Sequence, residues 1–580
     1  MTMKQWMYRP HRAKLDLIAD RYHISENLAE ILIKRGLYDW ESMDEYLYPG
    51  MDQISRPQML KDAGRAAGLL WEKIQNHRRI CVIGDYDVDG IMSSYILVSS
   101  LQRLGGDVIW RLPHRVRDGY GIRDYMVEEA VERGADTIIT CDNGISALAA
   151  AEKAREAGVT YIITDHHEIP RDPEGNEVIP VADAVVDPHQ EACPYPWKQI
   201  CGGVVAWQLM RLLYEQYAGA AYDDNMIVFA AIATVGDVMP LKKENRVIVR
   251  EGLARIDRTG NCGLDELIRL QEFQRAVTAR DIGFRIGPCL NAAGRLDDAG
   301  QALELLLEDN PSRAEKRALE LFRLNEERKT ITQKAVDTAE EEIRKMDLSE
   351  YPVLVLALED CPESVAGIVA GRIREKYYRP AMILTGGQER WKASGRSIPG
   401  YHMQRELTAC QDLLLEYGGH ALAAGFSLLP DNLEAFRERL YQNCTLTQED
   451  FTEKISLDCV SDFGVIGRDQ VEELELLEPL GQENEGALFA HRAVDLARVY
   501  LCGREKQIGK FTAREGGQYY TLTDFHVDQG VQAVVLERYG QEMWDALLAG
   551  RAQGCLVDVL YIPEISSYSG NVEFIVRDSR

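Results

Sequence analysis

Residues 80–90, ICVIGDYDVDG, place a short apolar run directly before an acidic turn that contains glycine. The same pattern returns in 137–144 (TIITCDNG) and in 161–168 (YIITDHHE). Each apolar run has the length of a buried strand, and helical periodicity follows in 91–104 and 147–158. Short strands that alternate with helices predict βαβ units and a mainly parallel sheet.

Acidic and imidazole side chains gather where these strands end. The carboxyl ends of parallel strands lie along one edge of a sheet, so we expect these side chains to converge there. The side chains concerned are those of Asp85, Asp87, Asp89, Asp142, Asp165, His166 and His167. Crowded carboxylates repel unless cations neutralise them. Oxygen and imidazole ligands without thiolates favour Mn²⁺ or Mg²⁺ over zinc. A later apolar segment ends in a further acid, Asp237.

Two classes of chemistry fit this acidic edge. The first is hydrolysis of a phosphoester by two metal ions, which would activate a water and stabilise the developing charge. The second is phosphoryl transfer through an aspartyl phosphate, because 87–90 (DVDG) superficially matches a haloacid-dehalogenase loop. That loop usually has Thr after its glycine, where this chain has Ile91. Trapping a phospho-aspartate would decide for the second class.

The overall charge is acidic. The 580 residues include 66 Lys and Arg against 93 Asp and Glu, a formal net charge of −27. This balance argues against a polybasic nucleic-acid binder and against adhesion to anionic membranes. It leaves room for a local basic groove or a metal site. The 12 cysteines form no C-x-x-C pair, which indicates free thiols in a reducing compartment. We therefore expect a cytoplasmic protein with no membrane partner.

The length predicts several domains. Helical periodicity marks 13–76, a long charged helix begins after Pro311, and a second strand–helix–strand rhythm follows it. From about residue 455 short strands with glycine turns predict a small β-barrel. The expected segments are 1–78 (helical extension), 79–305 (catalytic), 306–350 (connecting helix), 351–453 (second α/β unit) and 454–580 (barrel).

Taken in order, several motifs resemble those of the DHH phosphoesterase family. The residues 85–90, 141–144, 165–167 and 235–237 look like its four ordered motifs. Those at 394–397 (SGRS) and 418–425 (GGHALAAG) resemble its second domain, DHHA1. The likeness covers nearly the whole chain and is greatest to the family's single-stranded-DNA-specific 5′→3′ exonucleases. It implies an α/β fold in which a DHH-type parallel-sheet domain is joined by a long helix to a DHHA1 domain, followed by an OB-like β-barrel.

The resemblance also implies roles for individual residues. As ligands of two Mn²⁺ or Mg²⁺ ions it implies Asp87, Asp89, Asp142, His166 and Asp237, with Asp142 as the bridge between ions. His167 would contact the scissile phosphate or the leaving oxygen, while Asp165 and Asp85 would orient neighbouring ligands. Substrate-binding residues would be Arg115, Arg295, Ser394, Arg396, Gly418, Gly419 and His420. In the barrel, Tyr519, Tyr520, Phe525 and Tyr568 are candidate platforms for base stacking.

The implied activity is metal-dependent degradation of single-stranded DNA to nucleoside 5′-monophosphates, acting in DNA recombination and repair. A helicase and a single-strand-binding protein are the implied protein partners. The chain departs from the exonuclease pattern at Cys289, which replaces an Arg, and at Cys361 and Pro362, which replace Trp-His. These departures concern the grip on the substrate and keep one alternative open, a DHH phosphodiesterase for short oligonucleotides or cyclic dinucleotides. A non-enzymatic scaffold that binds single strands is a third alternative, which metal-dependent turnover would exclude.

Overall fold

The computed structural model describes residues 4–119, 121–387, 389–566 and 569–580. The chain divides into two compact units. One contains 1–48, 448–480 and 484–580, and the other contains 49–447 and 481–483. The five segment boundaries expected above stay a prediction. Among the described residues, no helix combines the length and the apolar character needed to cross a membrane.

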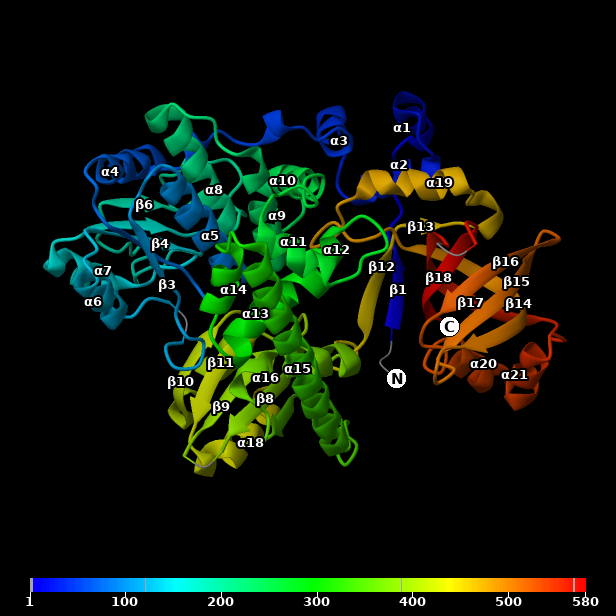
Figure 1. Cartoon of the computed structure of the whole chain (residues 1–580). Coiled ribbons are helices and arrows are strands. Elements are labelled where there is room, and N and C mark those ends of the chain that lie inside the picture. Colours follow the sequence, from blue (N-terminus) through cyan, green and yellow to red (C-terminus); the bar gives the residue numbers. More distant parts are fainter. Residues whose placement is uncertain (1–3, 120, 388, 567–568) are drawn as a thin grey trace. The chain divides into compact units, whose positions relative to one another are not determined.

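A five-stranded parallel sheet forms the first layer of the larger unit, in the order β3-β2-β4-β5-β6 (Figure 1). Its strands are β2 (Ile80–Ile83), β3 (Val108–Arg111), β4 (Thr137–Cys141), β5 (Thr160–Thr164) and β6 (Ala184–Val186). The three strands that end in acidic turns are therefore direct neighbours, as the parallel βαβ prediction requires.

Both faces of this sheet are covered, because its strands are apolar on both sides. Ile80 and Val82 of β2 pack into a core with helices α5 (Val88–Arg103) and α8 (Gly202–Leu213). The alternate residues of β2, Cys81 and Ile83, pack against α6 (Asp124–Glu132) and α7 (Leu148–Ala157) on the opposite face. The period-two alternation of a strand thus divides one short apolar run between two cores.

Further helices surround the first core. They are α4 (Ala63–Gln75), α9 (Ile227–Gly236), α10 (Lys243–Leu253), α11 (Cys262–Arg269), α12 (Ala279–Asp281), α13 (Gly287–Leu296) and α14 (Gly300–Leu306). Helix α9 is apolar on nearly every side and lies buried between α5, α8 and α10. Its last residue is followed directly by Asp237, so the packing of α9 fixes the position of that carboxylate.

The long helix predicted after Pro311 is α15 (Pro311–Ile343). Asn310 caps it by accepting a hydrogen bond from the Arg313 amide at 3.1 Å, and Pro311 occupies the first turn, where it costs no hydrogen bond. The beginning of α15 packs in the first core, and its end packs against α16 (Glu363–Tyr377). The helix therefore belongs to both α/β layers.

The second layer is a mixed five-stranded sheet in the order β10-β11-β9-β8-β7. Its strands are β7 (Leu354–Ala357), β8 (Ala381–Gly386), β9 (Trp391–Arg396), β10 (Leu414–Gly419) and β11 (Ala423–Leu428). Helices α17 (Met403–Thr408) and α18 (Leu433–Asn443) complete it. Only β7 and β8 are parallel.

The smaller unit contains the barrel predicted from the glycine-rich C-terminal segment. Strands β14 to β18 close on themselves because β14 pairs with both β15 and β17. The strands are β14 (Phe489–Cys502), β15 (Ile508–Glu515), β16 (Gln518–Asp524), β17 (Cys555–Ile565) and β18 (Val572–Ser579), with β13 (Cys459–Val460) alongside β14. Such closure is typical of an OB fold and confirms the predicted fold class.

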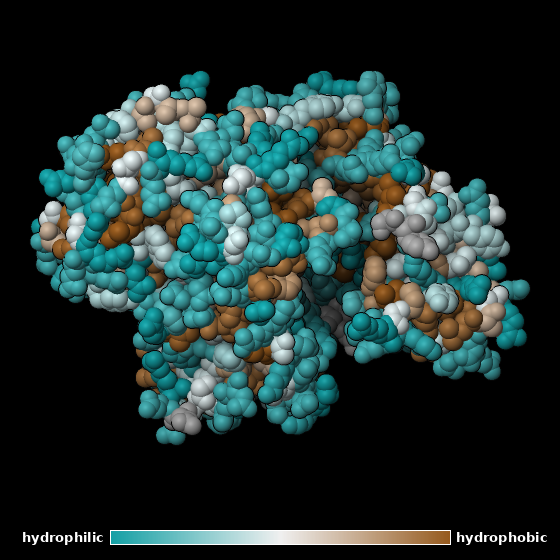
Figure 2. Space-filling view, viewed as in Figure 1, coloured by the Kyte–Doolittle hydropathy of each residue, from teal (hydrophilic) through white to brown (hydrophobic). Residues whose placement is uncertain are grey.

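Shorter elements complete the smaller unit. They are β1 (Lys4–Tyr8), α1 (Leu15–Tyr22), α2 (Glu26–Lys34), α3 (Trp40–Leu47), β12 (Glu453–Leu457), α19 (Arg468–Glu473), α20 (Val531–Tyr539) and α21 (Gln541–Leu548). Strands β1 and β12 pair in parallel, which joins the N-terminal segment to residues more than 400 positions away. The face seen in Figure 2 is mainly hydrophilic, as the large number of charged residues predicts, and apolar residues interrupt it in separate patches.

Candidate active site

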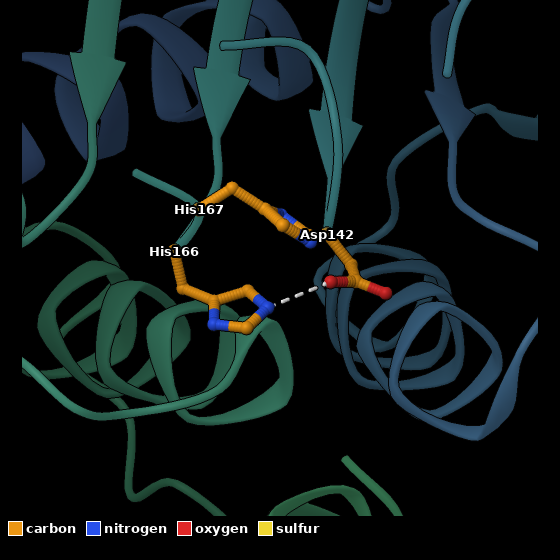
Figure 3. Close-up of side chains that lie close together, drawn as sticks. All are labelled: Asp142, His166 and His167. Carbon is orange, nitrogen blue, oxygen red and sulfur yellow. Dashed lines mark hydrogen bonds and ion pairs between the residues drawn. The ribbon is translucent and has the colours of Figure 1, made fainter. Parts of the chain in front are cut away.

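The acidic turns of three neighbouring strands meet at one edge of the parallel sheet. Figure 3 shows Asp142, which follows β4, facing the two histidines that follow β5. His166 Nε2 lies 3.0 Å from Asp142 Oδ1, 3.5 Å from Asp89 Oδ2 and 3.6 Å from Asp237 Oδ2. The structure therefore brings carboxylates from three separate parts of the sequence around one imidazole.

Asp89 is held by the N-terminus of helix α8. Its Oδ2 accepts a hydrogen bond from the Gly202 amide and its Oδ1 accepts one from the Gly203 amide, both at 2.7 Å. A helix N-terminus favours a carboxylate at this position. A Cβ on Gly202 would lie 2.8 Å from Asp142 Cβ, so only glycine lets the helix approach this closely. Asp89, which is 1% exposed, is thus held in one orientation by two backbone donors.

Burial and mutual repulsion disfavour the charged form of several carboxyl groups. Burial, together with the charges of Asp89 and Asp87, raises the pKa of Asp142 well above its ordinary value. The same causes raise the pKa of Asp237 to about 9. For Asp85, burial and the neighbouring Asp87 raise the pKa well above its usual range. A bound cation would remove this cost by compensating the negative charge.

Asp165 differs from these three carboxyl groups because hydrogen-bond donors surround it. Its Oδ2 accepts from the Ile145 amide at 2.9 Å and its Oδ1 accepts from the His166 amide at 2.8 Å. His167 Nδ1 lies 2.7 Å from Oδ1. Burial alone would raise the pKa of Asp165, but the hydrogen bond and charge of His167 outweigh it and the pKa falls. Conversely, burial lowers the pKa of His167, but Asp165 outweighs it and raises the pKa to about 9.

Three overlapping sets of ligand atoms could hold divalent ions here. They are Asp142 with His166 and His167, Asp89 with His166 and Asp237, and Asp85 with Asp87 and Asp142. Two of the buried carboxylate oxygens, Asp85 Oδ1 and Asp237 Oδ2, have no hydrogen-bond partner in the part of the chain that the structure describes. Oxygen and imidazole donors, unpaired buried oxygens and an excess of negative charge all fit hard divalent cations such as Mn²⁺ or Mg²⁺.

A pocket of about 890 Å³ opens beside this acidic cluster. Its cationic lining comes from Arg115, Arg123, Arg295, Arg396 and Lys392. Tyr86 also lines it and stands in the sequence between two acids of the first turn. Lys392 is paired with Glu363 at 2.9 Å, so the arginines carry most of the uncompensated charge.

The arginines of the pocket are held by neutral groups. Arg295 Nη1 donates to the backbone oxygen of Ser364 at 2.8 Å, and Arg396 Nη1 donates to Gly395 O at 2.8 Å. Arg115 stacks over the Tyr86 ring, with its guanidinium carbon 4.1 Å from the ring centroid. Burial lowers the pKa of Arg295 to about 9, and the positive charge of Arg115 adds to the effect. Among the described residues Arg115, Arg295 and Arg396 have no ion pair with a carboxylate, and guanidinium groups of this kind are suited to bind a phosphate.

Of the substrate-binding residues predicted in the second layer, some line the pocket and others do not. Ser394 and Gly418 line the pocket, and the Ser394 hydroxyl accepts from Arg396 Nη1 at 3.3 Å. Gly419 is the last residue of β10 and His420 begins the turn to β11, and neither is among the lining residues. The His420 side chain is exposed, and its amide donates to Ala423 O at 2.8 Å.

Three residues that the sequence did not single out belong to this region. Tyr86 and Arg123 line the pocket, and Asp187 follows β6, the fourth strand of the sheet that is followed by an acid. Asp187 is fully buried, and burial with the charge of Asp165 raises its pKa to about 8. The sequence could have indicated Asp187, because the apolar run before it is one more strand that ends in an acid. Tyr86 and Arg123 gave no such signal, because the pocket they share forms only by tertiary packing.

Of the three positions that depart from the exonuclease pattern, Cys289 and Cys361 are buried and Pro362 is exposed. The Cys289 thiol is buried and receives hydrogen bonds from Gln271 Nε2 and Asn325 Nδ2, both at 3.3 Å. Cys361 is also buried, and Pro362 caps the start of α16. None of the three lines the pocket.

The aromatic residues predicted in the barrel differ in exposure. Tyr519 is 69% exposed and Phe525 is 45% exposed, while Tyr520 is partly buried with its ring 5.7 Å from that of Phe463. Tyr568 lies outside the described residues.

Comparisons with protein families match three parts of the chain. Residues 79–234 match the DHH family, N-terminal domain, residues 350–445 match the DHHA1 domain, and residues 457–578 match the RecJ OB domain. The three matches follow one another in the order predicted from the motifs.

Curated relatives extend over most of the chain. The single-stranded-DNA-specific exonuclease RecJ of Bacillus subtilis is 33% identical over 538 residues, which are 92% of this chain and 67% of that protein. RecJ of Escherichia coli is 36% identical over 404 residues, which are 66% of this chain and 69% of that protein.

Solved structures agree with these relatives. RecJ of Thermus thermophilus in complex with Mn²⁺ superposes with a TM-score of 0.82 and 28% identity, over 100% of this chain and 80% of that one. Its Mg²⁺ complex gives a TM-score of 0.76 over 100% of this chain and 78% of that one, at 27% identity. The ordered acidic motifs, the arginine-lined pocket and the closed barrel thus agree with sequence and structure comparisons, and the chain belongs to the RecJ family of single-stranded-DNA-specific exonucleases.

Proposed function

We propose that the chain is a divalent-metal-dependent exonuclease that releases nucleoside 5′-monophosphates from the 5′ end of single-stranded DNA. The observation that carries the proposal is the position of Tyr86. It lines the arginine pocket, and its two sequence neighbours, Asp85 and Asp87, belong to the acidic cluster. A phosphate bound by the arginines would therefore lie within about one nucleotide of the acids. The relatives' names and the Mn²⁺ and Mg²⁺ complexes of their structures support the same activity.

The residues that would hold two Mn²⁺ or Mg²⁺ ions are Asp87, Asp89, Asp142, His166 and Asp237. Asp142 suits the bridging position, because it belongs to two of the three ligand sets. When bound, the ions would polarise the scissile phosphodiester and lower the pKa of a water for attack.

The remaining residues of the cluster would position the reacting groups. The carboxylate of Asp165 holds Nδ1 of His167 and favours the imidazolium form, so we assign Nε2 of His167 to the scissile phosphate or leaving oxygen. Asp85, buried beside Asp87, would orient that ligand.

On the substrate side, we assign Arg115, Arg295, Arg396 and Ser394 to a terminal phosphate. Guanidinium groups suit a phosphate dianion because they can donate two parallel hydrogen bonds. Among the described residues no atom lies within 4 Å of where a Cβ on Gly418 would be, so a DNA strand could approach its backbone closely. Gly419, at the end of β10, would support the turn to β11, and His420 would contact the DNA strand beyond the pocket. In the barrel, the exposed rings of Tyr519 and Phe525 would stack with bases farther along the strand.

The cellular setting follows from the substrate. Free 5′-ended single strands arise during DNA recombination and repair in the cytoplasm of bacteria, so we place the enzyme there. A helicase would supply such strands, and a single-strand-binding protein would cover them. Both are proposed partners of this chain.

The test is a nuclease assay on strands that carry a label at either end. We expect Mn²⁺- or Mg²⁺-dependent release of mononucleotides from the 5′ end of long single strands, and no release from blunt duplex. Rapid cleavage of dinucleotides without degradation of long strands would instead favour the oligonucleotide phosphodiesterase. Binding of single strands without any metal-dependent turnover would indicate the non-enzymatic scaffold.

A further inference from the structure

The pocket beside the acidic cluster extends beyond the residues assigned to a terminal phosphate. Its volume of about 890 Å³ is within the range of sites that enclose a whole small molecule. All of its lining residues belong to the larger of the two compact units. Part of the lining is a set of polar side chains on the second sheet to which the proposed function assigns no role. They are Thr385, Lys392, Glu416 and Ser427.

Strand pairing places these four side chains in one row across the second sheet, here called the polar row. Each is the direct partner of the next on strands β8, β9, β11 and β10, in the order Thr385, Lys392, Ser427 and Glu416. The Lys392 ammonium is a donor whose charge Glu363 compensates at 2.9 Å, whereas the Glu416 carboxylate can only accept. The polar row thus changes from donor to acceptor across the sheet.

The next row on the same face of the sheet is nearly flat. Two residues along each strand, Ser394 pairs with Gly425, and Gly425 pairs with Gly418. Residues two positions apart in a strand share a face and lie about 7 Å apart. Among the described residues, a Cβ on Gly418 would meet nothing within 4 Å, and one on Gly425 would meet only Ala393 O at 3.7 Å. A flat aromatic ring can therefore lie over the two glycines with its edge toward the polar row.

Two groups of the polar row lack the partners that such groups normally have. The Ser427 hydroxyl is buried, with 3% of the residue exposed, and no described residue forms a hydrogen bond with it. Buried hydroxyls are normally paired, because an unpaired one costs free energy. Glu416 is exposed, and it has no ion pair in the described part of the chain. By contrast, the Thr385 hydroxyl donates to Lys392 O at 3.3 Å. A ligand that donates to a carboxylate and also pairs with a hydroxyl would satisfy both groups.

We propose that the polar row reads the base of the 5′-terminal nucleotide and disfavours thymine. The inference rests on the proposed function, in which Arg396 and Ser394 hold the phosphate of that nucleotide. Adenine, cytosine and guanine carry an exocyclic amino group that can donate to Glu416, whereas thymine carries a carbonyl oxygen where cytosine has its amino group. In cytosine, the ring nitrogen beside the amino group can accept from the Ser427 hydroxyl. A thymine oxygen would face the carboxylate and be repelled.

Single strands that differ only in their first nucleotide test the inference. Release of the first, 5′-labelled nucleotide is measured, so that later cleavage steps do not contribute. We expect kcat/KM for a 5′-phosphorylated strand that begins with dC to exceed that for dT about 5-fold or more, with dA and dG on the side of dC. Equal values for the four strands would overturn the inference and leave the proposed exonuclease intact. No 5′ release from any strand would contradict the proposed function and with it the inference.

Variants of the polar row make the test specific to its side chains. Glu416→Lys should reverse the ratio of dC to dT, because an ammonium group only donates and so favours the thymine oxygen. Ser427→Ala should reduce the ratio. The matched control is Glu438→Gln, at an exposed acid on α18 outside the pocket, which should keep the wild-type ratio. Anisotropy with the inactive Asp142→Asn variant should show the same order of affinities without turnover. An unchanged ratio in Glu416→Lys would overturn the assignment.

Discussion

Arg295 donates a hydrogen bond from Nη1 to the backbone oxygen of Ser364 at 2.8 Å, which joins helix α13 of the first layer to the first turn of α16 in the second. The Arg295 side chain is partly buried in the pocket that both layers line, and no carboxylate within 4 Å pairs with it among the described residues. A positive charge is therefore kept in a place where burial disfavours it. Such an arrangement favours binding of an anion at the expense of stability.

Replacement of this arginine should separate stability from substrate binding. In Arg295→Met the buried charge is lost and most of the side-chain volume is kept, so we expect an unchanged or higher melting temperature. The KM for a 5′-phosphorylated strand should rise about 10-fold or more, because a charge-assisted contact to phosphate disappears. Steady-state kinetics and thermal melting check the two effects. The control is Arg258→Met, at an exposed arginine of the same unit. A lower melting temperature with unchanged KM would indicate a purely structural arginine.

Removal of the carboxylate proposed to bridge the ions should abolish turnover. For Asp142→Asn we expect a fall in kcat of more than about 100-fold, since even residues that only orient metal ligands typically account for 10–100-fold. Isothermal titration with Mn²⁺ should show weaker binding in the same variant. Glu152→Gln, which changes an exposed acid on α7, should leave both quantities unchanged. Full activity of Asp142→Asn would refute the ligand assignment.

The stability of the metal-free protein should fall as pH rises. The pKa of Asp237 is raised from 3.8 to about 9 in the fold, so the folded state keeps a proton that the unfolded state has lost. His167, with a pKa raised from 6.5 to about 9, acts in the same direction above pH 6.5. Asp165 has a lowered pKa, so its contribution to the free energy of unfolding stays constant over this pH range. Urea unfolding in EDTA should therefore give a lower free energy of unfolding at pH 9 than at pH 6.5.

Divalent cations should reverse that trend. Mn²⁺ favours the ionised carboxylates, so the free energy of unfolding with saturating Mn²⁺ should be higher at pH 9 than in EDTA, and the gap should widen with pH. The same measurement on Asp237→Asn removes the acid whose pKa the fold raises to about 9. If the free energy of unfolding of the wild type changes with pH in the same way with and without Mn²⁺, these groups do not hold the cation.

Two adjacent glycines of the second layer should respond differently to the same substitution. Gly419 has φ +138°, and a Cβ there would lie 2.4 Å from Ala423 O, so Gly419→Ala should lower the free energy of unfolding by about 1–3 kcal/mol. Gly418→Ala meets nothing within 4 Å and should change stability by less than about 0.5 kcal/mol. Because Gly418 lines the pocket, its methyl group should still raise KM. Chemical denaturation measures the change in stability and steady-state kinetics measures the change in KM. Each variant is the control for the other.

How much of the site was predictable follows from the kind of contact involved. The meeting of Asp89, Asp142 and His166 could be predicted because each follows a strand of one parallel sheet, and strand ends share an edge. The anchoring of Asp89 by Gly202 could not, since the two residues are 113 positions apart and no local pattern links them. Resemblance supplied the arginines, but not the stacking of Arg115 on Tyr86, which depends on packing.

The net charge of −27 makes a last prediction about salt. Arg115, Arg295 and Arg396 have no carboxylate partner among the described residues. If they make the main phosphate contacts, the slope of log binding constant against log salt should be about −2 for a single strand. A polybasic binder with about 6–10 phosphate contacts would show a much steeper slope. Fluorescence anisotropy at fixed divalent concentration, with the inactive Asp142→Asn variant, measures it. A slope steeper than about −5 would mean that a basic surface elsewhere on the chain carries the strand, despite the acidic composition.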